Sequence, residues 1–174
     1  SNNPALEHLD CYNNQLTALD VSNSPALESL DCGANQLTVL NVSNNPALEY
    51  LDCYNNQLTA LDVSGNPLLK DLNCSNYGNE GWSHNQITGL DVSNNPALED
   101  LSCDGNQLTA LDVSNNPALE SLDCSRNPIA TLDISRNRAL QTLLCYNNKL
   151  TNLDVSNNAE LEKLDCSNQR FADE

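Results

Sequence analysis

Eight cysteines are the residues of this sequence with the most evident chemistry. Thiols can form disulfides, bind zinc or act as nucleophiles. Six of the seven spacings between successive cysteines are 21 residues and the other is 29, so the cysteines occupy one recurring position. This position favours an inward ladder of free thiols, because a buried cysteine behaves as a small apolar residue. The eight are Cys11, Cys32, Cys53, Cys74, Cys103, Cys124, Cys145 and Cys166.

The other chemistries open to the cysteines depend on how they are spaced. Neighbouring strands lie about 4.8 Å apart, which is within the range of a disulfide, so a few bridges between repeats remain open. Zinc is disfavoured, because the sequence has no C-x-x-C pair and a ladder of strands does not converge four ligands tetrahedrally. A catalytic thiol is disfavoured as well, since it would have to leave the interior.

Aspartates recur at two further positions of the same unit. Carboxylates stacked at strand spacing repel one another, and a bound Ca²⁺ would relieve that repulsion. Calcium therefore remains an open alternative for Asp10, Asp31 and Asp52, although the sequence contains no EF-hand-like loop. The second series is followed by Ser and Asn, which favours turn-capping hydrogen bonds instead. We expect no metal site and no cofactor; the second series is Asp20, Asn41, Asp62, Asp91, Asp112, Asp133 and Asp154.

Catalytic groups other than the acids are scarce. The two histidines, His8 and His84, belong to different repeats, and no G-x-S-x-G, H-E-x-x-H or phosphate-binding glycine loop is present. Paired aspartates recur because the unit recurs, which is weak support for acid–base catalysis. We therefore expect no enzymatic activity and no catalytic residues.

Composition and charge narrow the classes of partner. The chain has 174 residues, with 24 acidic and 7 basic side chains, and a formal net charge of −17. This charge repels the phosphate backbone of nucleic acids and anionic membrane surfaces. No apolar run reaches the roughly 18 residues of a membrane-spanning helix, so we expect no membrane insertion.

The cysteines mark a repeated 21-residue unit, and a fixed period of this length is typical of a solenoid. Aligned on the cysteines, the unit reads L-x-x-L-x-C-x-x-N-x-L-T-x-L-D-V-S-x-N-P-A. Eight additional residues fit best at 77–84, where we expect an inserted surface loop that contains Trp82. The chain begins within a unit, so we expect residues 1–174 to form one domain that is a piece of a longer protein.

The elements that position these groups follow from the alternation of apolar and polar residues. Leu9, Asp10 and Cys11 alternate in, out and in, which is the period of a strand. Stacked units then give a mainly β solenoid of eight coils with one parallel sheet. The segments equivalent to Leu19–Val21 should be extended too, as a second narrow sheet or with short 3₁₀ turns. The amides of the Asn14 column should bond to turn backbone and to the next Asn.

The first half of the unit matches the leucine-rich-repeat pattern L-x-x-L-x-L-x-x-N-x-L, with Cys at the third Leu. With its 21-residue period, the chain resembles bacterial leucine-rich-repeat surface proteins of the family that includes internalin J. The resemblance implies a right-handed solenoid with its sheet on the concave face. It also implies a secreted or wall-attached location and an adhesive or partner-binding role.

Positions that change from unit to unit are the ones free to contact a ligand, and they lie on the outer face of the sheet. There the sequence is acidic and carries tyrosines, whose area and hydroxyl suit interfaces. We expect Tyr12, Tyr50 and Tyr54 to form one aromatic cluster, with Asp52 beside it and Trp82 as a loop contact. The favoured ligand is a protein. A glycan stacked on the same tyrosines is the second candidate, and a passive spacer is the third.

Overall fold

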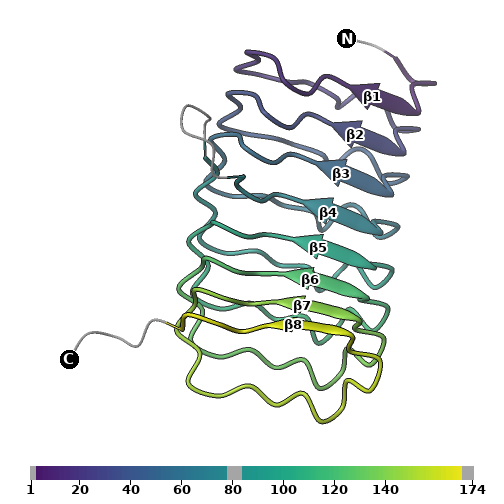
Figure 1. The fold of residues 1–174 in the computed structure, drawn as a ribbon. Coiled ribbons are helices and arrows are strands. Elements are labelled where there is room, and N and C mark those ends of the chain that lie inside the picture. The colour runs from purple at the N-terminus through teal and green to yellow at the C-terminus, as the bar shows by residue number, and fades with distance from the viewer. Residues whose placement is uncertain (1–2, 78–83, 170–174) are drawn as a thin grey trace.

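The structure, a computed structural model, describes residues 3–77 and 84–169. Every strand in this part of the chain is three residues long, and all of them form one parallel sheet in chain order (Figure 1). The predicted solenoid, with one strand in each coil, is confirmed, and each coil is numbered here after its strand. The strands are β1 (His8–Asp10), β2 (Ser29–Asp31), β3 (Tyr50–Asp52), β4 (Asp71–Asn73), β5 (Asp100–Ser102), β6 (Ser121–Asp123), β7 (Thr142–Leu144) and β8 (Lys163–Asp165).

The register of the sheet stacks equivalent residues of neighbouring units. Leu30 is paired with Leu51 and Asp31 with Asp52, and the same offset holds along the sheet. The pairing extends past the strands, because the backbone N of Cys32 donates to the carbonyl of Asp52 at 2.8 Å. A single unit could not bury its leucines, but each coil covers those of its neighbour. Consecutive 21-residue units therefore bury one continuous column for each apolar position.

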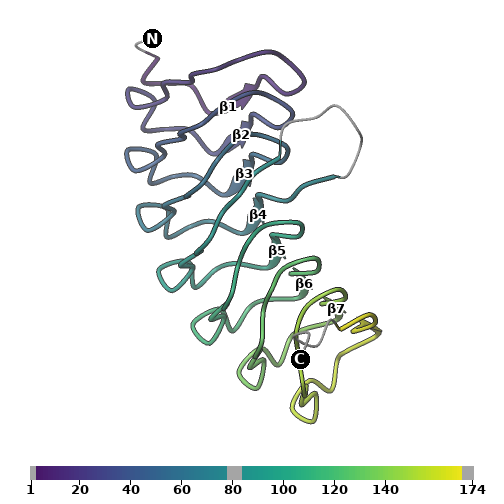
Figure 2. The same ribbon diagram turned by 90° about the vertical axis from the view of Figure 1, so that its left-hand side faces the viewer.

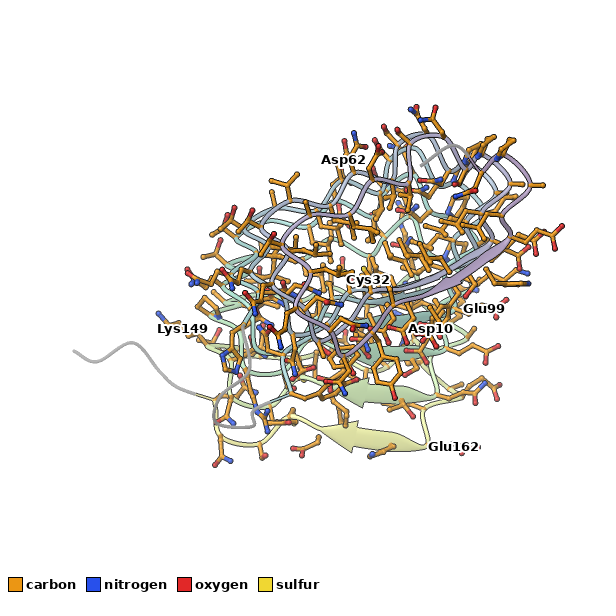
Figure 3. The ribbon with its side chains drawn as sticks, turned by 90° about the horizontal axis from the view of Figure 1, so that it is seen from above. Asp10, Cys32, Asp62, Glu99, Lys149 and Glu162 are labelled. Carbon is orange, nitrogen blue, oxygen red and sulfur yellow. The ribbon has the colours of Figure 1, made fainter. Side chains whose placement is uncertain are left out.

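The interior is filled by leucine, valine and cysteine columns. The side chains of Leu51, Cys53 and Val63 are fully buried. All eight cysteines are free, as the sequence predicts, and six of them are buried. In the first and last coils, which have a neighbour on one side, Cys11 is partly buried and Cys166 is exposed. In Figure 3 Cys32 lies inside the coil, between Asp10 on the sheet side and Asp62 on the opposite side.

The outer segments alternate as the sequence predicts, but they do not form the second narrow sheet that the sequence had left open. In residues 3–77 and 84–169 the only strands are those of the eight-stranded sheet, although Leu40 and Val42 are buried and Asn41 is exposed, as alternation requires. The stack curves with the sheet on its inner side (Figure 2), so the outer segments are spread further apart. A single backbone bond, such as Gln36 N to Leu16 O at 2.9 Å, joins neighbouring coils just before these segments begin. These described residues also contain no helix able to cross a membrane.

A ladder of buried asparagines closes the turn after each strand. Asn56 Nδ2 donates to the carbonyls of Cys32 and Cys53 at 3.0 and 3.1 Å, and its Oδ1 accepts from Leu37 N at 2.9 Å. The structural role predicted for this column is confirmed, but the predicted bond to the next Asn is wrong. From coil 2 onward the amide of each coil reaches the backbone of two coils, and without the column these carbonyls and N–H groups would be buried without partners.

A second asparagine ladder lies on the outer side of the coils, and the sequence analysis missed it. Asn45 Nδ2 donates to the carbonyls of Val21 and Ser24 at 3.0 and 2.7 Å. Its equivalents repeat the pattern, and all of them are buried. The Asn-Pro pairs had indicated a turn only. Their Asn side chains also tie each turn to the previous coil. The members are Asn45, Asn66, Asn95, Asn116, Asn137 and Asn158.

Candidate functional site

Strand β3 and the turn after it position three of the five candidate site residues. Tyr50 and Asp52 flank Leu51, whose side chain is buried, so both belong to the outer face of the sheet. The Tyr50 hydroxyl donates to Asp52 Oδ2 at 3.2 Å, and the backbone N of Tyr54 donates to Asp52 Oδ1 at 3.2 Å. Asp52 therefore joins the strand to the turn and holds both tyrosines beside itself.

The Tyr54 ring lies across the neighbouring coil, over Gly33. A Cβ added at Gly33 would collide with this ring, so the absence of a side chain there is what admits it. Gly33 stands between Tyr12 and Tyr54 in the column that follows each cysteine. Burial raises the pKa of Tyr54, and the charges of Asp52 and Asp31 and the hydroxyl of Tyr12, which is 49% exposed, add smaller contributions.

Tyr77, which the sequence analysis did not single out, completes the cluster. Its ring meets that of Tyr54 edge to face, with centroids 5.0 Å apart and an angle of 64° between the planes. Asn55 has a positive φ of 47°, a conformation that Asn tolerates, and its Oδ1 accepts from the backbone N of Tyr77 at 2.8 Å. Asn73 Nδ2 donates to the Tyr77 hydroxyl at 3.1 Å. We call Tyr12, Tyr50, Asp52, Tyr54 and Tyr77 the tyrosine patch.

Of the three tyrosines predicted to cluster, Tyr50 and Tyr54 are both bonded to Asp52, and Tyr12 is linked to Tyr54 through its electrostatic effect alone. Tyr77 is the first residue of the insertion, and this position was the only sign in the sequence that it could belong to the site. Its ring packs against Tyr54 of coil 3. Trp82 lies outside the described residues, as do residues 78–83 of the predicted loop.

Burial governs the electrostatics of this face. It raises the pKa of Asp52 to about 6, helped by the carboxylate of Asp31, while hydrogen bonds from Tyr54, Asn73 and Tyr50 oppose the rise. Burial also raises the pKa of Asp71 to about 6, and Asp100 on the next strand adds to this. Burial raises the pKa of the Tyr50 hydroxyl as well, and the negative charge of Asp52 adds to this rise. The face therefore holds carboxylates whose pKa values are raised by burial and, to a smaller extent, by neighbouring carboxylates.

The second aspartate series has the capping role that the sequence predicts. Asp62 Oδ1 accepts from Ser64 N at 2.9 Å, and Asn41 Oδ1 accepts from Ser43 N at 3.0 Å in the same way. The hydrogen bonds from serine lower the pKa of these aspartates. Within the described part of the chain, one group of potential metal ligands comes together, and it is exposed and lies on the first two coils: Glu7, His8 and Glu28.

Tyr146 lies apart from the tyrosine patch, in coil 7, and forms a cluster of its own. The guanidinium of Arg126 lies 5.5 Å from the centre of the Tyr146 ring. Arg126 Nη1 also lies 3.9 Å from Asp104 Oδ2, and that carboxylate is almost fully buried. An arginine, a tyrosine and an aspartate from three successive coils therefore meet on this edge of the sheet.

Known proteins resemble the chain in sequence and in fold. Residues 4–46 match the family described as leucine-rich repeats (2 copies). The functional domain of InlJ from Listeria monocytogenes, which includes a cysteine ladder, is 43% identical with a TM-score of 0.89. The match covers 95% of this chain and 35% of that one. A leucine-rich-repeat protein of Leptospira interrogans is 29% identical, with a TM-score of 0.81 and coverage of 91% and 44%.

A more distant match is TLR13 in complex with the RNA ssRNA13, at 25% identity and a TM-score of 0.68, covering 87% of this chain and 23% of that one. No curated protein sequence matches the chain significantly. The chain spans less than half the length of the InlJ and Leptospira proteins. The repeat, the thiol ladder and these matches agree. The chain is a leucine-rich-repeat protein, and it resembles the cysteine-ladder domain of the internalin InlJ.

Proposed function

We propose that this chain is the protein-binding, adhesive domain of a secreted or surface-exposed bacterial protein, with the tyrosine patch as its contact surface. The observation that carries the proposal is the fixed arrangement of Tyr54, Tyr77 and Tyr50 around Asp52. The buried columns of the unit, by contrast, are used by the apolar interior and by the two asparagine ladders. Preorganised aromatic side chains suit protein interfaces, because little conformational entropy is lost when they bind.

A binding role without enzymatic activity also fits the remaining chemistry. The free cysteines are mostly buried, and burial raises the pKa of Cys74 to about 12, which leaves its thiol unreactive. TLR13 binds an RNA in its complex, but the net charge of −17 argues against a nucleic acid here. The similarity to InlJ supports a bacterial surface or secreted location. A glycan that stacks on the same tyrosines is the second candidate.

Replacing Tyr12 and Tyr54 together with alanine is expected to weaken binding of the protein partner by at least about 30-fold, the size of a typical hot spot. The wild-type chain and the variant would be used as baits for a bacterial or host surface extract, followed by affinity measurement on the captured protein. Tyr146→Ala is the matched control, because Tyr146 occupies the same column in coil 7.

Equal loss of affinity in the Tyr146→Ala control contradicts the assignment of the contact surface. Binding of the wild-type chain to a glycan array, lost with the two tyrosines and without a captured protein, favours the carbohydrate candidate. A double variant that keeps every partner favours the spacer. Thermal unfolding of each variant shows whether the fold is retained.

A further inference from the structure

The tyrosine patch lies in a part of the chain that has almost no positive charge. Residues 1–115 contain fifteen acidic side chains and one basic side chain, Lys70, whereas the other six basic residues lie between 126 and 170. Lys70 Nζ is bonded to Glu49 Oε2 at 2.7 Å. Residues 1–115 therefore supply no lysine or arginine to pair with the aspartates on the sheet face of the first five coils.

The strand register brings these aspartates together. Asp31 is paired with Asp52 across β2 and β3, and Asp71 with Asp100 across β4 and β5. Adjacent parallel strands are about 4.8 Å apart, and like charges at this distance repel strongly where the surface is partly desolvated. A positive charge placed over the face would relieve this repulsion.

The chain contains its own example of how this surface holds a cation. At coils 5 to 7, Arg126 lies between the ring of Tyr146 and the carboxylate of Asp104. Arg126 has a φ of 54°, the left-handed conformation that this turn position also has in other coils, for example at Asn55 and Ala34, so the turn of the repeat presents its side chain on this edge. At coils 1 to 4 the column of Asp104 and Tyr146 holds Tyr12 and Tyr54, the aspartates lie in the neighbouring strand positions, and the column of Arg126 holds no arginine.

We propose that the tyrosine patch recognises arginine or lysine side chains of a partner protein, which stack on its exposed rings and pair with the partly exposed carboxylates of Asp31 and Asp71 beside it. Tyr12 and Tyr77 are each about half exposed, at 49% and 48%, so both rings can accept a guanidinium. The inference rests on the proposed function, and it assigns the partner a basic segment, most suitably one with arginine, whose planar group both stacks and pairs.

The test uses the capped peptide (Gly-Arg)₄ and the same peptide with citrulline, a neutral analogue, in place of arginine. Binding to the whole chain would be measured by calorimetry at about 0.15 M salt. Asp31 and Asp71 lie beside the tyrosine patch, and the variant that combines Asp31→Asn and Asp71→Asn is called here the patch variant. It keeps Asp52 and its three hydrogen bonds. Asn73 already occupies the strand position of Asp31 and accepts from Ser75 N at 3.2 Å, so the Asp31→Asn cap is retained.

The matched control combines Asp112→Asn and Asp133→Asn on the opposite side of the coils. It removes the same charge, and Asn41 shows that Asn keeps the serine cap there. We expect the arginine peptide to bind the wild-type chain and the control within twofold of each other. Binding to the patch variant should be at least tenfold weaker, and the citrulline peptide should not bind. Tyr54→Ala should lower the affinity as well.

Equal weakening in the patch variant and the control would show general attraction to an acidic protein and would overturn the proposal. So would binding of Ca²⁺ alone with the same dependence on Asp31 and Asp71, because the face would then be a metal site. If the captured protein partner is lost with Tyr12 and Tyr54 but retained by the patch variant, protein binding stands and the basic segment does not.

Discussion

Replacing Asn56 with alanine is expected to lower the free energy of unfolding by about 3 kcal/mol, because each buried polar group left without a partner costs about 1–3 kcal/mol. The change leaves the buried N–H of Leu37 without its partner, and it removes one of the two asparagine donors from each of the carbonyls of Cys32 and Cys53, which keep Asn35 and Asn85. For a chain of this size, a loss of 3 kcal/mol lowers the Tm by roughly 9 °C. Urea denaturation and thermal unfolding followed by circular dichroism measure both quantities.

Asn14→Ala is the matched control for the asparagine ladder. Asn14 occupies the same position in the first coil, where its side chain is exposed and donates to Cys11 O and Tyr12 O. Water can replace these bonds, so its loss should cost below about 1 kcal/mol. Similar losses at Asn14 and Asn56 would contradict the view that the asparagines matter through the burial of backbone groups between coils.

The second large effect concerns pH: we expect the Tm to be about 5 °C higher at pH 5.0 than at pH 7.5. In the folded chain the pKa values of Asp52, Asp71 and Asp104 are raised to about 6 from an ordinary value near 3.8, chiefly by burial. The folded state therefore binds more protons than the unfolded state between about pH 4 and 6, and stability rises as pH falls through 6. After discounting for solvent screening, the gain is about 2 kcal/mol.

The second aspartate series, on the outer side of the coils, sets the lower limit of the pH range in which the fold is most stable. Hydrogen bonds from serine lower the pKa values of Asp62 and Asp112. Groups of this kind stabilise the fold above about pH 4 and lose that contribution as pH falls through their folded pKa values. Stability should therefore be greatest between about pH 4 and 5.

Two substitutions separate this titration from the general repulsion of a chain with a net charge of −17. Asp71→Asn should reduce the gain in Tm between pH 7.5 and 5.0, because it removes one of the groups that take up a proton. Asp112→Asn changes the net charge equally and should leave the gain intact. A Tm that falls steadily from pH 7.5 to 5.0 would contradict the account.

Much of the fold could be predicted because the period of the repeat shows which residues become neighbours in space. The 21-residue spacing of Cys32, Cys53 and Cys74 places equivalent residues of successive units side by side, and the alternation around each cysteine then gives the inward face. Whether the outer segments form a second narrow sheet could not be predicted, because alternation describes one chain segment and carries no information about the distance to the next coil. That distance depends on the curvature of the whole stack.

The candidate site was predicted less completely. Tyr12, Tyr50 and Tyr54 share the outer face by their positions in the unit, so their grouping followed from the register. Tyr77 was missed because it begins the insertion, where the unit gives no register. Its contact with Tyr54 depends on the positive φ of Asn55 and on hydrogen bonds from Asn73. The Asn45 ladder was missed because an Asn-Pro pair has a sufficient local explanation as a turn.

The reactivity of the thiols tests most directly whether the coils stack with the cysteines inside. Because Cys53 points inward, its neighbours Asp52 and Tyr54 lie on the outer face. The chain would be titrated with a thiol reagent at pH 8, first folded and then in 6 M guanidinium chloride. We predict that Cys166 reacts at once, that Cys11 reacts more slowly because burial raises its pKa, and that the six buried cysteines are protected. All eight should react after denaturation. Immediate reaction of the buried cysteines in the folded chain, or fewer than eight free thiols in guanidinium, would contradict this arrangement.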